Sequence, residues 1–85
     1  MNISGLEVGA ARALGADITD DALTVDLADG RTISVPLAWY PRLLNGTPRE
    51  RQSWRLIGMG EGIHWPDLDE DLGTAGMLQG QRARG

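Results

Sequence analysis

Two adjacent segments in the first half of the chain alternate apolar and polar residues, as half-buried β-strands do. The apolar positions are Leu23, Val25, Leu27, Ile33 and Val35. A two-residue turn at Asp29-Gly30 would place the apolar residues of the two strands on opposite faces. We therefore predict a hairpin with a three-residue loop at 28–30 and Gly30 in the left-handed conformation. This register pairs Val25 with Ile33 and gives the hairpin one apolar face.

Prolines and a capping signal predict two short helices after the hairpin. Residues 37–44 are predicted to form the first helix, with Pro41 in its first turn, where a missing N–H leaves no intrahelical hydrogen bond unmade. Thr47 is the expected N-cap of a second helix of about one turn, with Pro48 at its first position. Glu50 then completes a capping box with Thr47.

The second half of the chain predicts two more strands, at 54–57 and 62–65, and a final helical turn. Pro66 closes the second strand. Thr74 is the expected cap of the turn, which runs through Met77 and Leu78 and ends at Gly80. These elements predict an α+β fold, a small antiparallel sheet (the hairpin plus two further strands) with one or two short helices on one face.

The chain has 85 residues, which is enough for one domain. We place that domain at 16–80, with residues 1–15 as an N-terminal arm or a short edge strand around 3–8, and residues 81–85 as a frayed tail. The N-terminus lacks a secretory signal pattern, and no apolar run is long enough to cross a membrane. We therefore expect a cytoplasmic protein with no membrane partner.

Charge and composition exclude several classes of function. The net charge is −4, and all eight basic residues are arginines, so direct nucleic-acid binding is disfavoured. Because the chain has no cysteine, it has neither disulfides nor thiolate chemistry. Arg49, Arg51 and Arg55 cluster in the sequence, and we expect them to pair with nearby acids.

Four of the twelve acidic residues form one dense group, called here the acidic run: Asp67, Asp69, Glu70 and Asp71. The spacing resembles a calcium loop, but the sixth and twelfth positions of an EF-hand would be Leu72 and Leu78 here, so that interpretation fails. We favour exposed carboxylates that flank the start of the C-terminal turn. The alternatives are a ridge that binds a basic partner and, less favoured, a metal site.

The aromatic residues suggest where a partner would bind. Trp39 and Tyr40 are adjacent on a predicted helix, so we expect one of them to be half exposed. Trp54 and Trp65 are expected to form a cross-strand pair. A partner-binding site is predicted where Tyr40, Arg42 and Trp65 meet the acidic run, because Trp, Tyr and Arg anchor protein interfaces.

The sequence offers little support for catalysis. His64 is the only histidine, and we expect a hydrogen-bonded structural or surface role, although Asp67 or Asp69 could orient it as a general base. No serine has the setting of a nucleophile. The alternating glycines at 58–62 lack the Lys-Ser/Thr of a phosphate loop and fit a turn. We therefore expect no enzyme activity and no cofactor.

Several motifs together resemble a known family. They are Asp29-Gly30-Arg31, the segments 35–43 and 54–58, and, as the most specific part, Gly62-Ile63-His64-Trp65-Pro66-Asp67-Leu68-Asp69-Glu70-Asp71-Leu72. The chain resembles the bacterial domain of unknown function 2442 from about Asp17 to Gly80. The resemblance implies a small α+β domain, often encoded beside the domain of unknown function 4160 in toxin–antitoxin-like pairs. It implies no catalytic residues.

These observations favour a noncatalytic protein-interaction module, an antitoxin-like partner of a small basic protein. The alternative is a phage or mobile-element inhibitor of the anti-CRISPR type, whose acidic surface blocks a nucleic-acid-binding complex. An enzyme that depends on His64 ranks third. Open sheet edges are also compatible with a homo-oligomer.

Overall fold

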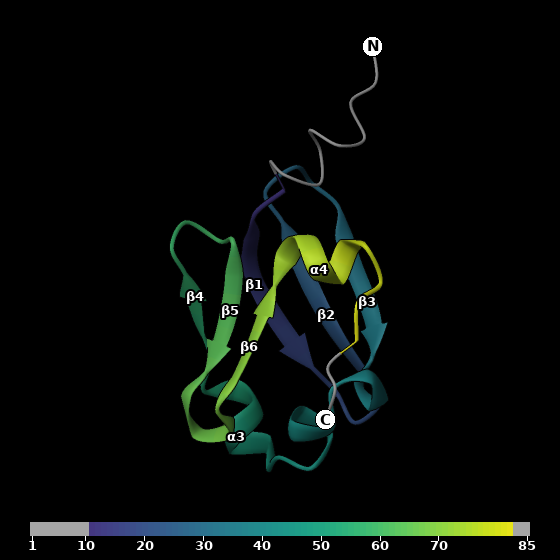
Figure 1. Cartoon of the computed structure of the whole chain (residues 1–85), viewed down its shortest axis with the longest axis vertical. Helices are drawn as coiled ribbons and strands as arrows, with labels where there is room; N and C mark the ends of the chain where they lie inside the picture. Colours follow the sequence, from purple (N-terminus) through teal and green to yellow (C-terminus); the bar gives the residue numbers. More distant parts are fainter. Residues whose placement is uncertain (1–10, 83–85) are drawn as a thin grey trace.

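Six strands form two antiparallel sheets in a computed structural model that describes residues 11–82 (Figure 1). Sheet A has the order β1-β2-β3, made of β1 (Ala13–Ile18), β2 (Ala22–Leu27) and β3 (Thr32–Pro36). Sheet B has the order β4-β5-β6, made of β4 (Arg55–Ile57), β5 (Gly62–Trp65) and β6 (Glu70–Gly73). The α+β class is confirmed. The hairpin and the two further strands belong to different sheets, and each sheet gains a strand that the sequence pattern did not indicate.

The β2–β3 hairpin has the predicted register. Leu23 pairs with Val35 and Val25 with Ile33. The N–H of Leu27 donates to the carbonyl oxygen of Arg31 at 2.8 Å, which closes the three-residue loop. Gly30 has a φ of +94°, in the left-handed region that favours glycine. The apolar face of β2 is therefore continuous and fully buried.

Strand β1 lies across the boundary that the sequence suggested at residue 15. It pairs antiparallel with β2, and Ala11 and Ala13 are buried in the core. The packed part of the chain therefore begins several residues before position 16. The small residues of β1 give no clear period-two signal, which is why the pattern did not reveal it. The edge strand predicted around 3–8 lies outside the described residues.

The single helix predicted at 37–44 is divided at Tyr40. A 3₁₀ turn, η1 (Leu37–Trp39), precedes a one-turn helix, α2 (Pro41–Leu44). Tyr40 has φ −127° and ψ 84°, outside the helical region, because a following proline clashes with a helical residue. The kink turns Tyr40 into the core and leaves Trp39 half-buried, as expected for one of the pair.

The second helix, α3 (Pro48–Gln52), has the predicted capping box. The N–H of Glu50 donates to the Thr47 hydroxyl oxygen at 3.2 Å, and the N–H of Thr47 donates to the Glu50 carboxylate at 2.8 Å. Pro48 occupies the first helical position. The helix is short, so both reciprocal bonds are needed to satisfy its first turn.

The end of the chain differs from expectation at two places. The acidic run continues from a 3₁₀ turn, η2 (Pro66–Leu68), through Asp69 in the left-handed conformation into β6. Thr74 is the first residue of α4 (Thr74–Leu78) and not its cap, because its hydroxyl donates to the carbonyl oxygen of Gly60 at 2.9 Å. Gly80, with φ +80°, follows the end of α4 as predicted.

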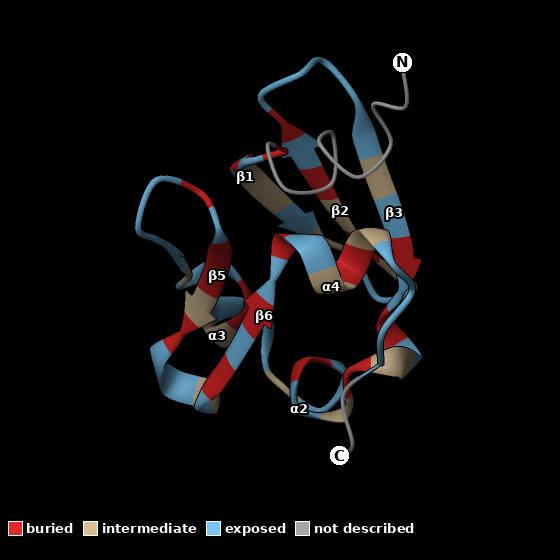
Figure 2. Ribbon diagram, turned by 45° about the horizontal axis from the view of Figure 1, so that its top comes forward, coloured by how far each residue is buried: buried red, intermediate tan, exposed pale blue. Residues whose placement is uncertain are grey.

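The core lies between the two sheets and the helical turns (Figure 2). Its largest member is Trp65, whose indole N–H donates to the carbonyl oxygen of Arg51 at 2.9 Å. Trp54 precedes β4 and is not part of the β4–β5 ladder, and its indole lies against Gly15 of β1 at the edge of the core. None of the helices in residues 11–82 has the length and apolar character needed to cross a membrane.

Buried Arg51 ties the α2–α3 segment to sheet A. Its guanidinium donates to the carbonyl oxygens of Leu43 and Leu44 at 2.8 and 2.7 Å, and it pairs with Asp20 at 2.9 Å. The expected pairing of this arginine cluster with acids is therefore found at Arg51, with an acid distant in sequence. The guanidinium provides donors for two carbonyl groups at the end of α2, where a helix leaves carbonyls without intrahelical partners.

Candidate functional site

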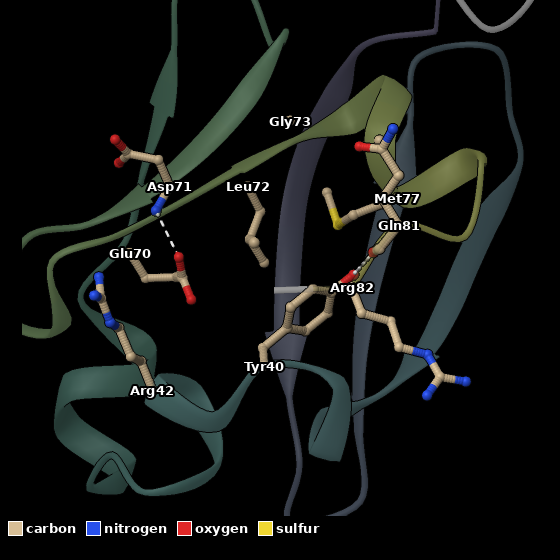
Figure 3. Close-up of a pocket in the computed structure, with 10 residues that line it drawn as sticks. Tyr40, Arg42, Glu70, Asp71, Leu72, Gly73, Met77, Gln81 and Arg82 are labelled. Carbon is tan, nitrogen blue, oxygen red and sulfur yellow. Dashed lines mark hydrogen bonds between the residues drawn. The ribbon is translucent and has the colours of Figure 1, made fainter. Parts of the chain in front are cut away.

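A pocket of about 450 Å³ lies where β6, α4 and the kink at Tyr40 meet (Figure 3). We call it the β6–α4 pocket. It is lined by Tyr40, Arg42, Glu70, Asp71, Leu72, Gly73, Gly76, Met77, Gln81 and Arg82. Strand β6 is the outer strand of sheet B, so no further strand covers its pocket side.

Glu70 is the acidic side chain that faces the β6–α4 pocket. It is 8% exposed, and its Oε1 accepts a hydrogen bond from the N–H of Asp71 at 3.2 Å. Its second oxygen accepts no hydrogen bond from any residue in the range 11–82 and points toward the side of the pocket where Tyr40 lies (Figure 3). A buried carboxylate with one open oxygen is a strong acceptor for an incoming donor.

Burial raises the pKa of the Glu70 carboxyl above its ordinary value, because the charged form loses water. The negative charges of Asp71 and Asp69 raise this pKa further. The hydrogen bond from the Asp71 N–H and the positive charge of Arg42 lower it. The pKa of Glu70 is raised overall, in keeping with the lack of an ion pair to this carboxylate within residues 11–82.

The floor of the β6–α4 pocket is apolar. Leu72 and Met77 are 8% and 4% exposed, and Tyr40 is 1% exposed. The Tyr40 hydroxyl donates to the carbonyl oxygen of Gln81 at 3.4 Å, which holds the returning chain over the pocket. Burial, and then the negative charge of Glu70, raise the pKa of the Tyr40 phenol. Tyr40 therefore stays neutral, and its buried ring forms part of the pocket floor.

The two arginines that line the pocket have other contacts. Arg42 donates to the carbonyl oxygen of Asp69, and no ion pair joins Arg42 to Glu70 in the described chain. The guanidinium of Arg82 lies over the Trp39 ring, 4.5 Å from its centroid, and points away from Glu70 (Figure 3). Both arginines line the pocket, but neither forms an ion pair with Glu70, whose carboxylate faces the space between Leu72 and Tyr40.

The structure brings together part of the predicted partner-binding site. Tyr40, Arg42, Glu70 and Asp71 line the β6–α4 pocket. Asp67 and Asp69 are exposed on the turn that leads into β6, outside the lining. Trp65, also predicted for this site, does not line the pocket: its side chain is fully buried, and its indole N–H donates to the carbonyl oxygen of Arg51.

Asp71 and His64 form a pair on the opposite face of β6. The two residues are cross-strand partners, and His64 Nδ1 lies in hydrogen-bond contact with Asp71 Oδ1. The predicted orienting carboxylates, Asp67 and Asp69, do not make this contact. Between residues 11 and 82, no group of three His, Asp or Glu side chains is placed to hold a metal ion.

Four lining residues from the end of the chain were not predicted as part of the site: Gly76, Met77, Gln81 and Arg82. Their positions depend on α4 turning the chain back toward the kink at Tyr40. No local pattern in the sequence indicates that return. The local signal for this segment was limited to the apolar side chain of Met77 and to Gly80, which ends the predicted helical turn.

Comparison with known proteins places the chain in a family. The family model described as protein of unknown function (DUF2442) matches residues 13–83. The chain belongs to this family. The DUF2442 match includes the acidic run, the kink at Tyr40 and all of α4, so the elements that build the β6–α4 pocket lie inside the family domain.

Two solved structures share the fold. A crystal structure of a protein of unknown function from Rhodospirillum rubrum is 29% identical with a TM-score of 0.73, over 86% of this chain and 90% of that one. A solution structure of the uncharacterized protein CV0863 from Chromobacterium violaceum is 18% identical with a TM-score of 0.75, over 98% of this chain and 78% of that one. No curated protein matches the chain.

Proposed function

We propose that this DUF2442 protein is a noncatalytic, cytoplasmic interaction module that binds a partner protein with a basic surface, as the antitoxin-like member of a pair. The observation that carries the proposal is the position of Glu70, a buried carboxylate open to the β6–α4 pocket. Exposed Asp67 and Asp69 stand beside this pocket. Together they provide a negative surface with an apolar floor, a combination that suits protein recognition.

The same geometry favours a partner protein over imitation of nucleic acid. Of the acidic run, Glu70 is buried and Asp71 contacts His64, so Asp67 and Asp69 remain as its exposed carboxylates without a side-chain partner in the described chain. Two such charges beside a pocket with an apolar floor form a local site. A surface that imitates a phosphate backbone would need a longer array of exposed charges.

The test is co-expression with the product of the neighbouring open reading frame, followed by pull-down. We expect a complex with the wild-type protein and a Kd at least about tenfold weaker for the double variant Asp67→Asn, Asp69→Asn. Asparagine suits the left-handed conformation of Asp69, so the backbone should be retained.

The matched control is Asp17→Asn with Asp21→Asn, which removes the same charge from two exposed positions of the β1–β2 region. We expect this control to bind about as well as wild type. No complex with the wild-type protein, or equal weakening by both double variants, would contradict the proposed function.

A further inference from the structure

The β6–α4 pocket has a polar end and an apolar end. Glu70 forms the polar end, while Leu72, Met77 and the ring of Tyr40 form the apolar floor. In Figure 3, Leu72 and Met77 project from β6 and α4 into the same space that the Glu70 carboxylate faces. A ligand that fits both ends has a cationic group on an apolar stem.

Lysine and arginine side chains have this chemistry. Their methylene stems pack on apolar surfaces, while the charged head keeps polar contacts. A carboxylate in a site with little water makes a strong, charge-assisted hydrogen bond to either head group. An anionic ligand is disfavoured at the polar end, because Glu70 would repel it, while Arg42 donates to the backbone carbonyl oxygen of Asp69 and Arg82 lies over the Trp39 ring.

We propose that the β6–α4 pocket receives one basic side chain of the partner, with the Glu70 carboxylate as its counter-charge. This deepens, and rests on, the proposed function. It assigns different roles to the acidic residues. Exposed Asp67 and Asp69 attract the partner, whereas Glu70 contacts the inserted side chain.

A bound cation changes the titration of Glu70 in a defined direction. In the free protein, the charged groups that act on the Glu70 carboxyl are Arg42 of α2, Asp69 of the turn before β6, and Asp71 of β6. The charge of Glu70 in turn raises the pKa of the Tyr40 phenol. From α4 and the residues after it, Met77 and Gln81 bring no charge, while the guanidinium of Arg82 lies over the Trp39 ring and points away from Glu70. A cation beside the open oxygen stabilises the ionised form, so the pKa of Glu70 must fall when the pocket is filled.

The experiment uses capped Gly-X-Gly tripeptides with arginine, lysine or citrulline at the central position. Citrulline keeps the size of arginine and removes the charge. NMR signals of the Glu70 carboxyl, the Leu72 methyls and the Met77 methyl report the pocket, and the pH titration of Glu70 is recorded with and without peptide. We expect the arginine or lysine peptide to shift these signals in a saturable way and to lower the pKa of Glu70.

Variants distinguish binding of the peptide in the β6–α4 pocket from general electrostatic attraction to the acidic protein. Glu70→Gln keeps an acceptor for the Asp71 N–H, and the indole N–H signal of Trp65 verifies its fold. We expect this variant to bind the basic peptides at least about tenfold more weakly, whereas Asp17→Asn, an exposed position of β1 outside the lining, retains binding. Equal binding of citrulline, unchanged binding to Glu70→Gln, or no shift at the pocket signals would overturn the proposal.

Failure of this inference is distinguishable from failure of the proposed function. If the partner binds wild type and Glu70→Gln equally but is weakened by the Asp67→Asn, Asp69→Asn variant, the inserted side chain is refuted and the proposed function stands. If a basic peptide fills the pocket while no neighbouring protein binds, the pocket assignment is supported and the proposed function fails.

Discussion

The N–H of Ala13 donates to the carbonyl oxygen of Gly60 at 2.8 Å, which joins β1 of sheet A to the β4–β5 turn of sheet B. The same carbonyl oxygen accepts a hydrogen bond from the Thr74 hydroxyl at the start of α4. Gly60 has a φ of +102° and lies too close to β1 for a side chain. This junction sets the position of sheet B, and therefore of β6 and its pocket, relative to the rest of the fold.

Substitution of Gly60 should test that junction. A Cβ at this position would lie 2.5 Å from the Ala13 carbonyl oxygen, and alanine rarely adopts a positive φ. We expect Gly60→Ala to lower the free energy of unfolding by at least about 2 kcal/mol in urea denaturation. Gly73→Ala is the control, because its Cβ would meet nothing within 4 Å, and its effect should stay below about 1 kcal/mol. Similar losses for both variants would count against this role of Gly60.

Removal of the Arg51 guanidinium should have a large effect on stability. The Arg51 side chain is 10% exposed and provides donors to the carbonyl oxygens of Leu43 and Leu44. We expect Arg51→Met to lower the free energy of unfolding by about 2–4 kcal/mol, because it withdraws these donors. Asp20, the 94% exposed partner, should contribute less than about 1 kcal/mol when changed to Asn. A larger effect at Asp20 than at Arg51 would show that the ion pair, and not the carbonyl contacts, is the main stabilising interaction.

The raised pKa of Glu70 predicts a pH dependence of stability. Because the native state keeps this proton to a higher pH than the unfolded chain, the unfolded state ionises first as pH rises above the ordinary value of 4.5. The contribution of Glu70 to the free energy of unfolding is therefore most favourable below that pH and is lost as pH rises through the native pKa. Glu70→Gln removes this loss. We expect the difference in the free energy of unfolding, Glu70→Gln minus wild type, to increase from acidic to neutral pH. A difference that stays constant or falls would refute the raised pKa of Glu70.

Local sequence signals predicted the parts of the fold that local geometry determines. The β2–β3 hairpin follows from period-two alternation and from Gly30, which fixes the turn. The capping box of α3 follows from Thr47 and Glu50, whose reciprocal bonds span three residues. In both cases the interacting groups are close in sequence, so no knowledge of tertiary packing was needed.

The site was only partly predictable, because its burial pattern depends on distant segments. Residues 70–73 alternate buried and exposed, but their acidic character indicated a solvated turn and not a strand. Glu70 faces a pocket that α4 and the Tyr40 kink also line, and both segments are distant from it or separated from it in the sequence by other elements. Trp65 is of a residue type that is common at interfaces, yet its indole N–H donates to the carbonyl oxygen of Arg51 inside the core.

The central claim is that the β6–α4 pocket and the adjacent carboxylates form the partner-binding surface. The most direct measurement is a ¹H–¹⁵N spectrum of the labelled protein titrated with the purified product of the neighbouring open reading frame. We predict the largest changes at residues 67–73, at Arg42 and at residues 76–82, with small changes in the β2–β3 hairpin. Changes concentrated on β1–β3 or β4, with the pocket residues unaffected, would contradict the account.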